Sequence, residues 1–212
     1  GSITEVDIAG LPCRIFRISY VGDTGWEIYT DWDNGPALWD ALMKAGADLG
    51  IRATGGGVYG TSGRLEKGYR LMGAELESEY NPLEAGLARP KVKAANFIGK
   101  EALKKIKAEG IKRKLVGIEI LGDPISKVVP PEYTPGYFVP DHWPVFDDKN
   151  EIGYVTSKCF SPRLEKNIGY AFIPIGYAKE GTQFTIRSPY ANLTAKVVPT
   201  PFYDPKKKIP IK

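Results

Sequence analysis

A glycine-rich stretch holds the residues of this chain whose types and spacing are best suited to chemistry. It covers residues 50–73 and reads GIRATGGGVYGTSGRLEKGYRLMG, with five glycines from Gly55 to Gly63. A phosphate-binding loop needs a lysine and then a serine or threonine directly after its last glycine, because the lysine must reach the phosphates. Arg64 and Leu65 follow Gly63 instead, so the stretch does not predict a phosphate cradle.

Dinucleotide binding is an equally poor interpretation of these glycines. Gly55, Gly57 and Gly60 match the G-x-G-x-x-G spacing loosely, but the stretch lacks the strand–helix–strand context in which an acidic residue holds a ribose. We therefore expect the glycines to supply turns with positive φ and close backbone approach. Tyr59, set among them, either points its phenol into a cavity or packs in the core.

The residues that build metal centres and hydrolytic triads are scarce. Cys13 and Cys159 are too few and too far apart for a zinc site or a disulfide framework, and we expect reduced thiols in a cytoplasmic protein. His142 is the single histidine of the chain. A histidine-based metal centre or a Ser-His-Asp triad is therefore nearly excluded, and we predict no metal site.

Composition restricts the class of partner. The chain has 212 residues, 42% of them apolar, and a net charge of +4. The charge lies mostly in KKIKAEGIKRK and PKKK, which is sparser than the basic face of a nucleic-acid binder. No apolar run is long enough for a membrane span, and the first residues lack a secretory signal. We predict neither nucleic acid nor membrane as a partner, and we expect the chain to begin inside a longer parent protein.

The elements that position these residues start with a predicted β-hairpin. CRIFRISY (residues 13–20) and WEIYT (residues 26–30) have strand composition, and Asp23-Thr24-Gly25 predicts a tight turn between them. Because side chains alternate along a strand, Glu27 and Tyr29 are expected to point to the same side. A core-facing helix should follow a cap at Asn34 or Asp33, with Pro36 near its first turn and Gly50 as its stop.

The remaining pattern divides the chain into an α+β part and a β part. Arg64–Arg70 predicts a short helix, and a second helix is expected from Gly99 to Gly110. Short β runs separated by turn residues then predict a barrel or sandwich of roughly a hundred residues; these runs are KLVGIEIL, WPVFD, IGYVTS, NIGYAFIP, TQFTIRS and LTAKVVPTPF.

Several blocks, in one order along nearly the whole chain, resemble a known family. They are RISYVGDTGWEIYT, ALWDALMKAGADLGIR, GRLEKGYRLMGAEL, NPLEAGLARPKVKAANFIGKEALKKI, GYVTSKCFSP and PFYDPKKK. The series is similar to the tetrahydrofolate-dependent aminomethyltransferases, the T-protein of glycine cleavage and its relatives. The resemblance begins partway through these longer proteins, so it implies that an N-terminal portion of the parent chain is missing here.

The resemblance implies a fold and a cofactor. Residues 1–95 would be the C-terminal part of a folate-binding α+β domain, 96–110 a connecting helix, and 111–212 a jelly-roll-like β-barrel. The cofactor implied is tetrahydrofolate. Glu27 matches the family's glutamate that binds the pterin ring, where a carboxylate accepts two N–H bonds from an aminopyrimidine edge. Tyr20, Tyr29 and Arg64 are our further predicted cofactor-binding residues.

The glycine stretch departs from the family pattern. T-proteins carry an Arg-Asp pair before their LRLE segment, whereas this chain has Tyr59 or Gly60 in that position. The stretch is more similar to the aryl O-demethylase branch, which moves a methyl group from a methoxy-aromatic acid to tetrahydrofolate. The resemblance implies Tyr59 as the catalytic residue, because a phenol with an ordinary pKa near 10 matches a phenolate leaving group.

O-demethylation with a small methoxy-aromatic acid as methyl donor is therefore the function predicted here. The first alternative is an aminomethyltransferase that acts with a lipoyl carrier protein. The second is a non-catalytic folate-binding or assembly fragment, because the family's catalytic carboxylate lies in the portion that is missing.

Overall fold

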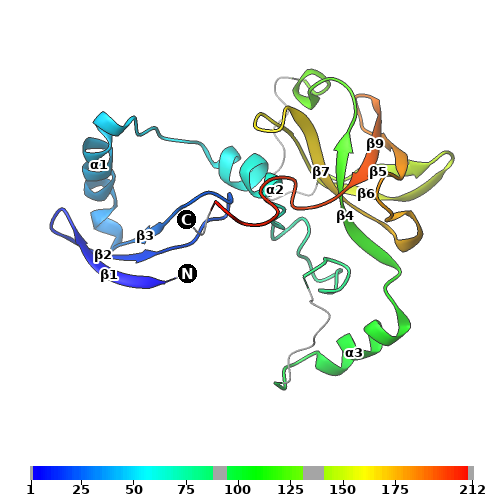
Figure 1. Ribbon diagram of the computed structural model, residues 1–212, viewed down its shortest axis with the longest axis horizontal. Coiled ribbons are helices and arrows are strands. Elements are labelled where there is room, and N and C mark those ends of the chain that lie inside the picture. Colours follow the sequence, from blue (N-terminus) through cyan, green and yellow to red (C-terminus); the bar gives the residue numbers. More distant parts are fainter. Residues whose placement is uncertain (1, 88–94, 131–140, 210–212) are drawn as a thin grey trace.

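The computed structural model describes residues 2–87, 95–130 and 141–209. A three-stranded sheet with one long helix occupies one end of the molecule and a closed β-barrel the other, with a short helical segment and the C-terminal residues between them (Figure 1). The predicted class, a mixed α+β part followed by a β-barrel, is confirmed. The division at residues 95 and 110 remains our prediction.

The small sheet has the order β1-β2-β3 and is antiparallel. Its strands are β1 (Ile3–Ile8), β2 (Leu11–Phe16) and β3 (Glu27–Tyr29). β2 and β3 pair as the predicted hairpin, with Phe16 opposite Glu27. The predicted tight turn at Asp23-Thr24-Gly25 is wrong, because β2 ends at Phe16 and residues 17–26 form a long connection that packs elsewhere. β1 was not predicted.

The predicted helix after Asn34 exists, but its core-facing character is wrong. Helix α1 spans Gly35–Ala45, between the short 3₁₀ helices Trp32–Asn34 and Ala47–Leu49. Leu38 is the only buried residue of α1, whereas Trp32 and Leu49 beside it are 94% and 87% exposed. The main contacts of the helix with other helices and strands are with the two short helices at its ends, so within the described residues most of its apolar face is not buried.

The six predicted β runs form one closed antiparallel barrel in the order β4-β7-β6-β5-β8-β9. Closure leaves no open strand edge in such a barrel. The helix predicted between Gly99 and Gly110 is α3 (Lys100–Glu109), which leads into the barrel. The strands are β4 (Arg113–Ile120), β5 (Trp143–Asp147), β6 (Asn150–Ser161), β7 (Lys166–Pro174), β8 (Gln183–Arg187) and β9 (Asn192–Val198).

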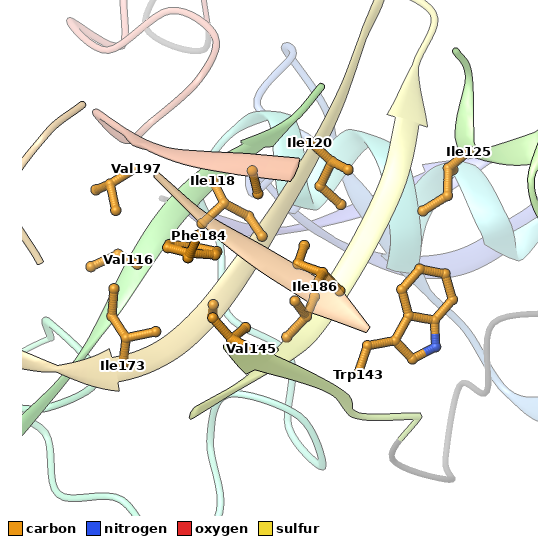
Figure 2. Packing of buried hydrophobic residues seen from close by; sticks show 13 residues of the cluster. Val116, Ile118, Ile120, Ile125, Trp143, Val145, Ile173, Phe184, Ile186 and Val197 are labelled. Carbon is orange, nitrogen blue, oxygen red and sulfur yellow. The ribbon is translucent and has the colours of Figure 1, made fainter. Parts of the chain in front are cut away.

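The main hydrophobic core fills this barrel. Every strand contributes inward side chains to it, mostly Val and Ile, together with Phe184 and the fully buried Trp143 (Figure 2). Two further 3₁₀ turns, Ile125–Lys127 and Ile175–Tyr177, lie between strands of the barrel. β-branched side chains fit the pleated inner surface of a barrel well. The barrel therefore has a well-packed core and can hold the segments that contact its outer surface in fixed positions.

The C-terminal residues run back from the barrel toward the small sheet (Figure 1). Lys67 binds the carboxylate of Asp204 at 2.7 Å, and the Tyr203 amide donates to the Glu66 carbonyl at 2.8 Å. The Thr24 hydroxyl donates to the carbonyl of Ile209 at 3.2 Å. These contacts hold the connection 17–26 and the glycine-rich segment against the C-terminal residues that follow the barrel. Among the described residues, no helix has the length and apolar character that crossing a bilayer requires.

Candidate functional site

Three of the predicted residues meet at one carboxylate. Glu27 and Tyr29 lie on the same face of β3, as expected from the two-residue period of a strand, and the Tyr29 phenol donates a hydrogen bond to Glu27 Oε2. The Tyr59 phenol lies 3.5 Å from Glu27 Oε1 and donates to it at the outer limit of hydrogen-bond distance. Residues 32 positions apart in the sequence thus converge on one acceptor group.

Tyr20, the fourth predicted residue, packs its ring against the aromatic rings of this cluster. Its ring lies 5.0 Å from that of Tyr59 and stacks on Tyr69 at 5.7 Å. Its hydroxyl donates to the Arg70 carbonyl at 2.5 Å. Sequence reasoning missed Tyr69, although its place inside the glycine-rich stretch was a usable signal. We call Tyr20, Glu27, Tyr29, Tyr59 and Tyr69 the Glu27 cluster.

Within the glycine-rich stretch, residues 56–66 fold as a helix and not as a series of turns. Residues 58–63 (Val58–Gly63) form a π-helical segment that continues into α2 (Arg64–Glu66). The expected positive φ angles are absent from Gly55 to Gly63 and occur instead at Gly50, Gly68 and Gly73. Helical backbone is possible because glycine also adopts negative φ readily. Short π-helical segments inside helices frequently occur at functional sites.

The expected close backbone approach is found at Gly63 and at Gly68, where a Cβ would lie 3.1 Å from Pro201 Cα. A Cβ on Gly63 would lie 2.7 Å from the Val58 carbonyl oxygen and 2.8 Å from a methyl carbon of Val21. Gly55 and Gly57, in contrast, face open space. The contact with Val21 joins the π-helical segment to the connection that carries Tyr20. Gly63 therefore brings two parts of the Glu27 cluster together.

Arg64, the fifth predicted residue, is not brought into the cluster. Its side chain is 3% exposed and points toward the barrel. The guanidinium donates to the carbonyls of Gly60 and Tyr69 and to the side chains of Glu75 and Ser157. Its donors are thus directed into the protein, and cofactor binding by Arg64 remains a prediction that the geometry does not favour.

The Glu27 cluster lies at the surface of the described chain. Tyr29 and Tyr59 are 53% and 49% exposed, so a ligand can reach both phenols. The hydrogen bond to Glu27 raises the pKa of Tyr29 above its ordinary value, because the carboxylate favours the protonated phenol. A shallow groove of about 670 Å³ continues from Tyr29 along the small sheet.

The Glu27 cluster contains no histidine and no cysteine. No group of histidine, cysteine and acidic side chains suited to a metal ion occurs in the part of the chain that the structure describes. His142 stacks on Tyr154 of the barrel at 4.6 Å. Desolvation lowers the pKa of this imidazole below its ordinary value. The cluster offers a carboxylate, phenols and aromatic faces.

Two family models match the chain. The model described as the GCVT N-terminal domain matches residues 1–93, and that of the glycine cleavage T-protein C-terminal barrel domain matches residues 113–204. An aminomethyltransferase of Caldanaerobacter subterraneus is 41% identical over 94% of this chain and 50% of its own length. That of Bacillus pumilus is 39% identical over 95% of this chain and 52% of its own length.

A solved structure has the same fold. The aminomethyltransferase T of the glycine cleavage system from Bartonella henselae superposes with a TM-score of 0.76 at 25% identity, over 91% of this chain and 50% of that chain. The chain spans about half the length of the curated relatives it matches. These relatives favour the alternative prediction, aminomethyl transfer, over O-demethylation.

Proposed function

Because the chain belongs to the glycine cleavage T-protein family, we propose that it takes part in tetrahydrofolate-dependent transfer of an aminomethyl group from a lipoyl carrier protein. The observation that carries this proposal is the Glu27 cluster, in which one carboxylate is approached by two phenols beside stacked aromatic rings. The relatives named above support aminomethyl transfer as the type of reaction.

The residues of the cluster fit a folate. The two oxygens of Glu27 each have a second lone pair beyond the phenol they accept from, so the carboxylate can still take two N–H donors from an aminopyrimidine edge. The exposed ring of Tyr59 and the Tyr20–Tyr69 stack offer aromatic faces to a flat heterocycle. Tetrahydrofolate, when bound, would accept the one-carbon unit.

Glu27 would orient the cofactor, and Tyr29 would orient Glu27. The raised pKa of Tyr29 keeps its phenol protonated at neutral pH, so the phenol remains a hydrogen-bond donor to Glu27 Oε2. This bond limits rotation of the carboxylate about its terminal torsion. Two acceptor oxygens would thereby face the ligand in a preferred plane.

Tyr59 would act as the proton donor. When the bond between the aminomethyl carbon and the carrier sulfur breaks, the sulfur keeps the electron pair and needs a proton, which the Tyr59 phenol would supply and regain from water, and the amino nitrogen would leave as ammonia. The contact with Glu27 at 3.5 Å is long enough to be exchanged for one with the substrate. Catalytic hydrogen bonds are often this long before a substrate is bound.

Glu27→Ala tests the binding part of the proposal. We expect the variant to lose about 10–150-fold in tetrahydrofolate affinity, the effect of removing a charged hydrogen-bond partner. Glu109→Ala is the control, because Glu109 is an exposed glutamate at the end of α3, outside the small sheet and its groove, that pairs with Lys105 at 3.9 Å. Calorimetric titration, or fluorescence of the adjacent Trp26, measures both. Equal affinity in Glu27→Ala and wild type would remove Glu27 from the site.

We propose a second polypeptide partner on the surface beside the cluster. The aromatic and aliphatic side chains exposed there come from β3, α1 and their flanks; they include Trp26, Trp32, Trp39 and Leu49. β1 and β3 each pair on one side alone within the described sheet, so both present strand edges. The occupant we propose is the polypeptide that corresponds to the unmatched half of the relatives.

Mixing experiments test this partner. The unmatched half of the Caldanaerobacter relative should co-elute with the chain and shift tryptophan emission to shorter wavelength as Trp32 and Trp39 lose contact with water. Trp39→Glu should weaken the association by about tenfold or more, because it places a charge in an apolar contact. Ile175→Glu, an exposed apolar position on the barrel, should leave it unchanged. Equal weakening by both variants, or no co-elution, would contradict the proposal.

O-demethylation of a methoxy-aromatic acid is the second candidate function. The observation in its favour is Tyr59, which reaches Glu27; Tyr59 or Gly60 stands where the family resemblance led us to expect an Arg-Asp pair. Product analysis separates the two candidates. Aminomethyl transfer delivers a one-carbon unit at the oxidation level of formaldehyde, whereas demethylation delivers a methyl group.

A further inference from the structure

The π-helical turn that carries Tyr59 is hydrogen-bonded to the buried guanidinium of Arg64. Tyr59 and Gly60 are neighbours in the π-helical segment, and Arg64 Nε donates to the Gly60 carbonyl at 2.7 Å. The wider spacing of π-helical hydrogen bonds makes such segments uncommon, and they persist where other contacts support them. Arg64 supplies one such contact directly beside Tyr59.

The other side of the same guanidinium is bound to the barrel. Arg64 Nη2 donates to the Ser157 hydroxyl on β6 at 2.6 Å, and Nη1 donates to Glu75 Oε2 at 3.0 Å. Nη1 also donates to the Tyr69 carbonyl at 3.2 Å. One side chain therefore connects β6, the Tyr59 turn and the residue on which Tyr20 stacks.

Glu75 and Ser157, the two side chains that bind the Arg64 guanidinium, form a fully hydrogen-bonded group that we call the platform. Glu75 is completely buried, and besides Arg64 its carboxylate accepts from the Leu71 amide at 2.9 Å, the Thr156 hydroxyl at 2.6 Å and the Ser157 hydroxyl at 2.5 Å. A buried network of this kind is rigid, because moving any member leaves a polar group without a partner. The guanidinium is thus fixed relative to the barrel.

We propose that Arg64 is a positioning residue: from the platform formed by Glu75 and Ser157, it fixes the π-helical turn and so the direction in which the Tyr59 phenol points. The significance of that direction rests on the proposed function, in which Tyr59 supplies a proton. The barrel then has a defined part in the site, because its strand β6 determines where a side chain of the other domain lies.

Ser157→Ala tests this link with little disturbance of packing. It removes the acceptor of Arg64 Nη2 and one donor to Glu75, and leaves the Arg64–Glu75 ion pair in place. Ser161→Ala is a matched control: Ser161 is also buried on β6 and donates to a buried glutamate, Glu66 Oε1, at 2.5 Å, but it has no bond to Arg64. Ser157→Thr keeps a hydroxyl and should rescue.

Hydrogen exchange followed by mass spectrometry is the primary measurement. We expect amide exchange in residues 58–63 to accelerate about tenfold in Ser157→Ala, the effect of one lost hydrogen bond to a charged group, and to return toward wild type in Ser157→Thr. Ser161→Ala should leave exchange in this segment unchanged. Acceleration in both alanine variants, or in neither, would overturn the positioning role of Arg64.

Turnover separates this inference from the proposed function. In an active preparation Ser157→Ala should lower kcat with little change in KM, since tetrahydrofolate binding by Glu27 is retained. Suppose that hydrogen exchange changes as expected but the wild type shows no folate-dependent transfer. The proposed function would then be rejected, and the link from Ser157 through Arg64 to residues 58–63 would be retained. Normal transfer in wild type with an unchanged kcat in Ser157→Ala would reject the positioning role alone.

Discussion

Tyr59→Phe is expected to lower kcat for one-carbon transfer by about 10²–10⁴-fold, the usual contribution of a general acid, and to leave tetrahydrofolate affinity nearly unchanged. The substitution removes one hydroxyl and keeps the ring that packs 5.0 Å from Tyr20. Steady-state kinetics with the chain and its proposed polypeptide partner, combined with a folate titration, measures both quantities.

Tyr177→Phe is the matched control for this substitution. Tyr177 lies on the barrel and, like Tyr59, donates its phenol to a carboxylate, that of Asp147 at 2.5 Å. It should leave kcat unchanged. If Tyr59→Phe turned over at the rate of wild type, Tyr59 would be a packing residue. A loss of folate affinity equal to the loss of kcat would make it a binding residue instead of an acid.

Glu75→Leu is expected to lower the free energy of unfolding by about 3–5 kcal/mol, because it leaves the buried charge of Arg64 without its partner. Glu75 and Arg64 are 0% and 3% exposed and lie 3.0 Å apart, so water cannot replace the lost carboxylate. Denaturant unfolding followed by tryptophan fluorescence measures the change. Glu77→Ala, at an exposed neighbouring position, should change stability by less than about 0.5 kcal/mol.

A double variant distinguishes an unpaired charge from a simple packing defect. Arg64→Met with Glu75→Leu removes both charges, and such apolar replacements of buried pairs are often neutral or stabilising. The double variant should therefore be more stable than Glu75→Leu alone. If it were equally or more destabilised, the hydrogen bonds of the network, rather than the charge pairing, would dominate the stability of the junction.

Local sequence patterns were sufficient to predict most of the helices and strands. Alternating β runs divided by glycine, proline and aspartate located all six barrel strands, and Gly99 and Gly110 bounded α3 correctly. The pairing of β2 with β3, and with it the common face of Glu27 and Tyr29, followed from the strand period. These features depend on residues close together in the chain, which is why sequence alone predicts them.

At two other places the structure differs from what the local sequence signals predict, because packing between distant segments decides the conformation. The turn residues Asp23-Thr24-Gly25 indicated a tight hairpin, but Gly22 and Val21 pack on Lys67 and Gly63, which draws the connection away from the strands. The apolar face after Asn34 indicated a core helix, yet within the described residues Leu38 is the only side chain of α1 that is buried. In both cases the outcome depends on segments far away in the sequence or outside the described chain.

The sequence by itself determined the fold class, the family and the identity of four clustered residues, because composition, strand period and ordered motifs are local properties. Tertiary structure alone decided that Tyr59 lies on a π-helical turn within reach of Glu27, and that Arg64 faces the barrel instead of the cluster. Arg64 and Ser157 are 93 positions apart. Only burial in the folded chain, which requires every donor to find an acceptor, determines which partner the guanidinium takes.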